Sequence, residues 1–183
     1  MHKGKFILFF CAFLAALTLG HAAQQIPISI ETLTTKSDAV IQGKVIGIIC
    51  KRDPDGRIFT EIRLNIVEQI KGNSNKKIFK MVSAGGILGS VRSGSVIAPK
   101  FKINEEVVVF LVFNSRGEAI PVGLNQGCFE VYNRAEKGPA MVRNAFHGSP
   151  KSTNSYAIIK RATGKFKPLT LAELKRRIRR AEK

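Results

Sequence analysis

The chain has 183 residues, with 30 Lys and Arg against 13 Asp and Glu, and its formal net charge is +17. This length fits one ordinary domain and is enough to bury a core. After residue 19 no apolar run approaches the roughly 20 residues that a membrane-spanning helix needs, which excludes a chain that crosses the membrane several times. So positive a charge favours contact with polyanions, acidic proteins or anionic membrane surfaces, although a generally basic protein without such a partner has the same composition.

The amino terminus has the three parts of a secretory signal peptide. Lys3 and Lys5 make a short basic start, residues 6–19 form an uncharged apolar run, and Gly20 and Ala22 are the small residues ahead of a cleavage site. An uncleaved membrane anchor is the alternative, but the run is shorter than a bilayer requires. We therefore predict export to the periplasm or the extracellular space, after which the net charge is +15.

Removal of residues 1–22 leaves one domain, residues 23–160, followed by a basic helical tail, residues 161–183. It also leaves two cysteines, Cys50 and Cys128, in an oxidising compartment. A disulfide between them is the favoured interpretation, and two reduced, buried thiols are the alternative.

In chain order, residues 29–36 predict a short helix with Ser29 as its N-cap. Residues 39–49 are rich in β-branched side chains and are interrupted by Gly43, which suits a bulge. Asp53-Pro54-Asp55-Gly56 predicts a turn. Residues 58–66 have a period of two, with Ile58, Ile62, Leu64 and Ile66 on one face and Glu61, Arg63 and Asn65 on the other. This pattern predicts a half-buried strand paired with the preceding one as a hairpin.

Residues 77–82 predict a third strand, and residues 84–100, with four glycines, predict the longest irregular connection of the core. The wholly apolar residues 107–113 predict a strand buried on both faces. Residues 114–117 predict a hairpin turn, and residues 119–123, 128–132, 140–143 and 156–160 predict further strands. Thr170 and Glu173 then form a capping box at the start of a terminal amphipathic helix.

The sequence lacks a catalytic constellation. His147, the single histidine after residue 22, lies in a Gly/Ser/Pro segment and is expected to be exposed. Glu105 and Glu106 could form a paired acid site, but solvated turn residues are the favoured interpretation. We therefore predict no enzyme activity, no cofactor and no metal ion.

Two segments are candidate binding surfaces. The first is the Gly-rich segment 84–94, whose backbone N–H groups could hold a phosphate but which lacks the Gly-Lys-Ser/Thr sequence that such a site needs. The second is the terminal helix, whose narrow apolar stripe docks on the core while its charged side chains face either solvent or an anionic surface. The candidate residues are Gly85, Gly86, Gly89, Lys175, Arg176, Arg177, Arg179 and Arg180.

Three segments follow one another along the chain: residues 37–45, 67–72 and 101–111. Their order resembles that of the motifs in the netrin-like module, the domain type that includes tissue inhibitors of metalloproteinases. The similarity covers roughly residues 29–132 and extends to exported bacterial proteins with the same skeleton. It implies an all-β fold, a small closed OB-like antiparallel barrel of about five strands, with a short N-terminal helix and an amphipathic basic C-terminal helix. The inhibitor mechanism of that family needs an N-terminal cysteine, whereas cleavage here would leave Ala23 or Gln24 first.

These features together predict an exported, non-enzymatic binding module that docks to a protein partner. A binder of anionic polymers or anionic membrane surfaces is the second hypothesis, and a protease inhibitor of different geometry is the third. No specific nucleic acid is expected, because export separates the chain from the usual nucleic acids.

Overall fold

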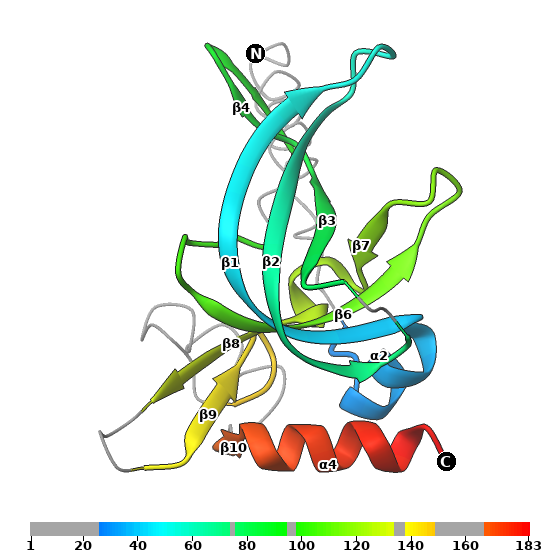
Figure 1. The fold of residues 1–183 in the computed structure, drawn as a ribbon, viewed down its shortest axis with the longest axis vertical. Helices are drawn as coiled ribbons and strands as arrows, with labels where there is room; N and C mark the ends of the chain where they lie inside the picture. Colours follow the sequence, from blue (N-terminus) through cyan, green and yellow to red (C-terminus); the bar gives the residue numbers. More distant parts are fainter. Residues whose placement is uncertain (1–25, 74–75, 95–97, 134–137, 149–166) are drawn as a thin grey trace, which may run out of the picture.

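The computed structural model describes residues 26–73, 76–94, 98–133, 138–148 and 167–183. The predicted signal peptide, residues 1–22, and the predicted strand 156–160 lie outside these residues. The described part contains ten strands and two α-helices, and every strand pairing in it is antiparallel (Figure 1). The strands are β1 (Ala39–Arg52), β2 (Ile58–Lys71), β3 (Ile78–Ala84), β4 (Gly86–Leu88), β5 (Val91–Ser93), β6 (Glu106–Phe113), β7 (Ala119–Pro121), β8 (Cys128–Asn133), β9 (Ala140–Arg143) and β10 (Leu169–Thr170). The helices are α2 (Ile30–Lys36) and α4 (Leu171–Ala181), and a 3-10 turn, η1 (Leu124–Gly127), joins β7 to β8.

Eight strands form one sheet in the order β10-β9-β8-β6-β1-β2-β3, with β7 paired to β6 beside this path. The remaining two, β4 and β5, form a separate two-stranded hairpin. In Figure 1 the long hairpin of β1 and β2 rises to the top of the molecule, beside β4, and α4 lies across the bottom.

The sheet is not closed, so the prediction of a small five-stranded barrel was wrong. Closure requires the two end strands to pair, but β10 and β3 end the path unpaired with each other. Although β3 approaches β7, no ladder of hydrogen bonds joins these two strands in the described part of the chain. The prediction failed because β8 and β9 extend the sheet toward α4 rather than folding back to β3, and a sheet that stays open keeps its edges.

The bend in β1 comes from irregular pairing with β2. Its register shifts at Val40/Ile41, at Gln42/Gly43 and at Val45/Gly47. The shift at Gly43 confirms the predicted bulge, and a side chain there would meet the backbone oxygen of Asn65 at 3.0 Å. Each bulge strengthens the local twist. Strand β1 can therefore belong to two parts of the sheet that are oriented differently.

The predicted alternation in β2 is confirmed, since Ile62 and Leu64 are fully buried while Asn65 and Val67 are exposed. The predicted hairpin with β1 is also confirmed, because the two strands pair from Val40 opposite Lys71 to Arg52 opposite Ile58. The turn at residues 53–56 closes it, with Gly56 donating its N–H to the oxygen of Asp53 at 2.9 Å.

Strand β6 lies between two apolar cores, as its unbroken apolar sequence predicted. Val108 and Phe110 face the core that includes α2 and α4. Val107, Val109 and Leu111 face the second core, which β1, β2 and β3 cover. All five side chains are at most 2% exposed, so β6 is the element that both cores share.

The two helices begin where the sequence predicted. The Ser29 hydroxyl accepts from the N–H of Thr32, and the Thr170 hydroxyl accepts from the N–H of Glu173. In α4, Leu174 and Ile178 are fully buried against the first core. Neither described helix is long and apolar enough to cross a membrane.

Replacement of Leu174 by Ala should lower the free energy of unfolding by about 2–5 kcal/mol, because it removes apolar contacts and leaves a cavity beneath α4. Arg180→Ala is the control on the same helix, since Arg180 is exposed, and it should change the value by no more than about 0.5 kcal/mol. Urea denaturation followed by circular dichroism measures both. Equal stabilities of the two variants would show that α4 is not part of the core.

Candidate docking surface

The Gly-rich segment 84–94 is not the irregular loop that the sequence predicted. It folds into the hairpin of β4 and β5, in which Gly86 pairs with Ser93 and Leu88 with Val91. Gly85 has a φ of +79°, and a Cβ on it would lie 2.3 Å from the Cα of Gly94. Gly85 therefore has a packing reason to be glycine that needs no ligand.

Gly86 is equally constrained. Its Cβ would lie 2.5 Å from the sulfur of Cys50 and 2.6 Å from the hydroxyl of Thr60. The Thr60 hydroxyl donates to the oxygen of Gly85 at 2.7 Å and ties the hairpin to β2. Gly89, at the tip with φ +60°, has nothing within 4 Å of its would-be Cβ, so its role is to form the turn.

The predicted disulfide is absent, since Cys50 and Cys128 are both free. Cys50 lies in the upper half of β1, opposite Thr60 on β2. Cys128 begins β8, opposite Val109, and packs against the second core. The sequence could not show that the two strands carry their cysteines to different places in the sheet.

The basic side chains of α4 mostly hold the helix in place. Lys175 and Arg179 both contact the carboxylate of Glu68 on β2, at 2.6 and 3.0 Å. Arg177 makes two hydrogen bonds to Glu31 on α2, at 2.7 and 2.8 Å. These contacts lower the pKa of Glu68 and of Glu31.

Arg176 pairs with Glu173 within the helix at 2.5 Å, and Arg180 is exposed. The binding candidates on α4 are therefore largely engaged in structural ion pairs. They also lie at the opposite end of the molecule from Gly85, Gly86 and Gly89 (Figure 1), so the structure does not join the two candidate surfaces into one site.

A feature that the sequence analysis missed is a group of exposed apolar side chains, here called the upper surface. It lies on the upper half of β1 and on the β4–β5 hairpin. Its members are Ile46, Ile48, Ile49, Ile87 and Val91, which are 44%, 37%, 40%, 63% and 44% exposed. Successive strand residues point to opposite faces, so Ile48 and Ile49 lie on opposite faces of β1 and the upper surface includes both faces of this end of the molecule. Large aliphatic side chains exposed together at one end of a molecule mark contact sites more often than scattered ones do.

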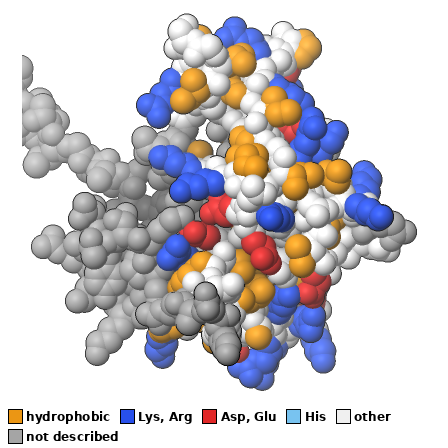
Figure 2. Space-filling model, turned by 60° about the vertical axis from the view of Figure 1, so that its left-hand side comes forward, with side chains coloured by type: hydrophobic (Ala, Val, Ile, Leu, Met, Phe, Trp, Pro, Cys, Tyr) orange, Lys and Arg blue, Asp and Glu red, His pale blue; other side chains and the backbone are white. Residues whose placement is uncertain are grey.

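Basic side chains accompany this upper surface. Lys44, Arg52, Lys80 and Arg92 are all exposed, and none of them forms an ion pair with a described acid. Glu61, the acid of β2 in this region, is already bound by Lys51 and Arg63, at 2.6 and 2.9 Å. Figure 2 shows hydrophobic and basic side chains interspersed over the upper part of one face, with acidic side chains nearer its middle.

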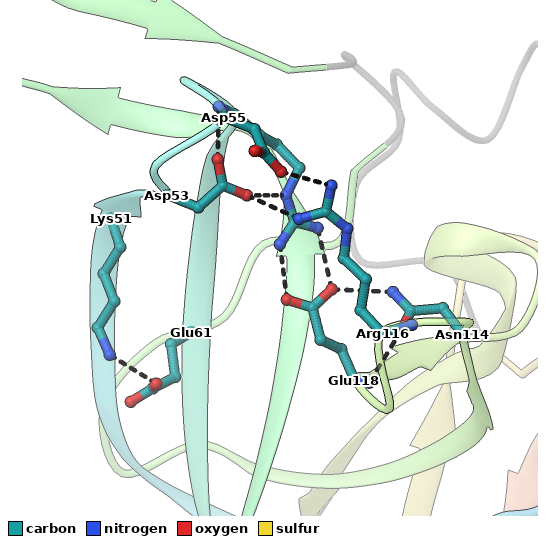
Figure 3. Close-up of polar contacts among 8 residues, drawn as sticks. Lys51, Asp53, Asp55, Glu61, Asn114, Arg116 and Glu118 are labelled. Carbon is teal, nitrogen blue, oxygen red and sulfur yellow. Dashed lines mark hydrogen bonds and ion pairs between the residues drawn. The ribbon is translucent and has the colours of Figure 1, made fainter.

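An ion-pair network, here called the clasp, joins the β1–β2 turn to the β6–β7 turn (Figure 3). Arg57 contacts Asp53 at 2.8 Å and Glu118 at 2.6 Å. Arg116 reaches across to Asp53 at 3.2 Å and to Asp55 at 2.9 Å. The clasp fixes the end of the hairpin that carries the upper surface.

A shallow cavity of about 620 Å³ lies at the start of β6, where Glu105, Glu106 and Glu130 are among its lining residues. Each carboxylate is already engaged: Glu105 accepts from the N–H of Lys102 at 2.9 Å, Glu106 accepts from the amide of Gln42, and Glu130 pairs with Arg143 at 3.0 Å. Within the described ranges, no three His, Cys, Asp or Glu side chains are grouped so as to hold a metal ion.

His147 is half-buried, so the expectation of an exposed side chain was wrong. Its Nε2 lies 2.8 Å from the oxygen of Ile28, and its ring stacks on Phe129 with 5.9 Å between centroids. Burial lowers the pKa of this imidazole. The side chain ties the segment before α2 to the first core.

No protein-family model matches the chain, and a search of curated proteins finds no match either. The resemblance to the netrin-like module therefore remains a prediction from short motifs.

Because of the clasp, the free energy of unfolding should decrease at acidic pH. Hydrogen bonds from Arg57 lower the pKa of Asp53 and of Glu118. A carboxyl whose pKa is lowered by folding stabilises the protein above its unfolded pKa of about 4, and this contribution is lost as the pH falls through the folded pKa. The free energy of unfolding should therefore fall between about pH 5 and pH 2.

Glu118→Gln should remove part of this dependence, so that the variant loses less stability than the wild type over the same interval. Glu182→Gln, at the exposed end of α4, is the control and should keep the wild-type dependence. Urea denaturation at a series of pH values makes the comparison. An unchanged slope in Glu118→Gln would show that the clasp does not contribute.

Proposed function

We propose that the protein is an exported, non-enzymatic binding module that docks a protein partner with an acidic surface. The observation that carries this proposal is the upper surface, where exposed aliphatic side chains stand among basic side chains that lack described ion-pair partners. Export is supported by the composition of residues 1–22.

The mixture of side chains favours a protein over a simple polyanion. Protein interfaces combine a desolvated apolar centre with a polar, charged rim. Ile46, Ile48 and Ile49 supply apolar area, and Lys44 and Arg52 stand at the two ends of this stretch of β1. Complementary charge speeds association and selects acidic partners, while apolar burial supplies affinity that resists salt.

A binder of anionic polymers or anionic membrane surfaces is the second candidate function. The net charge of +17 favours it, as do exposed basic residues on several elements, among them Lys36, Lys80 and Lys183. Such binding depends on charge alone, so its affinity should fall steeply as salt is raised.

The double variant Ile46→Thr/Ile49→Thr tests the proposal, because it removes apolar area without altering charge or strand propensity. Wild-type protein, purified from cells that express the full chain, is immobilised and exposed to envelope and secreted material. The proposal expects a defined protein to survive a high-salt wash, and its affinity, measured with the purified partner, to fall about tenfold or more in the variant.

Val67→Thr is the matched control, since Val67 is 59% exposed on β2 outside the upper surface, and it should bind as the wild type does. Retention of acidic polymer or lipid alone, released by salt from all three proteins, would replace the proposal with the second candidate.

A further inference from the structure

In the described part of the chain, the upper half of β1 has no paired strand on one of its sides. Strand β1 pairs with β6 only from Ala39 to Lys44. Val45 still exchanges backbone hydrogen bonds with the turn ahead of β6, through the oxygen of Glu105 and the N–H of Asn104. From Ile46 to Arg52 the only strand hydrogen-bonded to β1 in the described part of the chain is β2, while β4 packs nearby with Gly86 beside the side chain of Cys50.

The backbone groups that face this free edge follow from the alternation of antiparallel pairing. On β2, the N–H of Ile66 and the oxygen of Ile58 bond toward β3, at 2.9 and 3.0 Å. The backbone N–H and C=O groups of the even-numbered residues of β2 between them therefore also point toward β3. The backbone groups of Phe59, Glu61 and Arg63 point toward β1.

The partners of those three residues on β1 are Lys51, Ile49 and Gly47. The N–H of Asp53 bonds to the oxygen of Arg57 at 3.0 Å and continues the same alternation. Consequently the N–H and C=O groups of Ile48, Cys50 and Arg52 point away from β2, toward the open side, and no described residue bonds them.

We propose that this edge accepts an extended, acidic segment of the partner as an added β-strand. The inference rests on the proposed function and specifies how the partner binds. Unpaired edge groups template pairing with another chain, and strand addition obtains affinity from the backbone and specificity from alternate side chains.

The charge around the edge selects an acidic strand. Lys44 and Arg52 stand exposed at its two ends, and exposed Lys102 lies in the turn that bonds Val45. Glu61, on the neighbouring strand, is neutralised by Lys51 and Arg63. Apolar side chains of the added strand would lie against Ile48 or Ile49, and acidic ones would meet the basic ends.

A second copy of the chain fits this edge less well. Edge-to-edge pairing of two β1 strands would bring together two exported molecules of net charge +15, each with Lys44 and Arg52 along the contact. Like charges on facing strands oppose pairing. The bulge at Val45/Gly47 twists the edge further and discourages self-association.

The test uses a fluorescent, capped peptide of alternating Val and Glu, about eight residues long, as the probe. In two analogues, the backbone nitrogens of alternate residues are methylated, in one analogue on the Val residues and in the other on the Glu residues. Each analogue keeps the charge and side chains of the peptide but loses the N–H donors along one of its two edges. A poly-Glu peptide of equal charge reports binding by charge alone. Fluorescence anisotropy at moderate salt gives the affinities, and analytical sedimentation reports self-association.

The proposal expects the alternating peptide to bind at least about tenfold more tightly than poly-Glu and than at least one N-methylated analogue. Arg52→Glu should weaken binding severalfold. Lys183→Glu, at the far end of the molecule, should leave it unchanged. Equal binding of all four peptides, no binding of the alternating peptide, or dimers that dissociate in Arg52→Glu would each overturn it. If the protein partner of the upper surface were still retained at high salt, the proposed function would stand without strand addition.

Discussion

The course of β1 is the constraint on which the rest of the structure depends. Its first half, from Ala39 to Lys44, is held between β2 and β6, and among the described strands its second half pairs with β2 only. Two register shifts within the first half and a third at Val45/Gly47 turn the strand, so the hairpin leaves the region where β6 joins the two cores. A strand bent in this way does not keep β6 as a neighbour along its whole length, so the upper part of β1 has an edge without a paired strand in the described part of the chain.

The distribution of charge follows from this architecture. Acids are scarce, and those at the joints are used for structure: Glu31 and Glu68 hold α4, and Asp53 and Glu118 hold the clasp. The basic side chains that remain unpaired are therefore exposed by default, and some of them accompany the apolar side chains of the upper surface. Ion pairs this exposed contribute modestly to stability, so their main effect is to fix the helix and the hairpin tip in place.

Local signals in the sequence predicted the elements well. Alternation in residues 58–66, the apolar run 107–113, the turn at residues 53–56 and the caps at Ser29 and Thr170 each depend on neighbouring residues. Strand pairing depends on residues far apart in the chain. The closed barrel was predicted from the order of the netrin-like motifs, and the disulfide between Cys50 and Cys128 from the even number of cysteines. Neither feature specifies which strands meet.

The candidate site was predicted less well for the same reason. Gly85 and Gly86 were interpreted as part of an irregular binding loop. In the folded structure these positions require glycine because Gly94, Cys50 and Thr60 approach them closely. Ile46, Ile48 and Ile49 have the composition of ordinary strand residues. Their exposure depends on which elements cover this part of β1, and the sequence has no local sign of that.

The most direct test of the open edge is amide hydrogen exchange of the free protein, resolved by residue with NMR. Exchange should alternate along the upper half of β1, with the amides of Ile48, Cys50 and Arg52 exchanging roughly a hundredfold faster than those of Ile49 and Lys51, which bond to β2. Uniform protection across these residues would mean that another strand already occupies the edge, and it would contradict the account of an open sheet that receives its partner there.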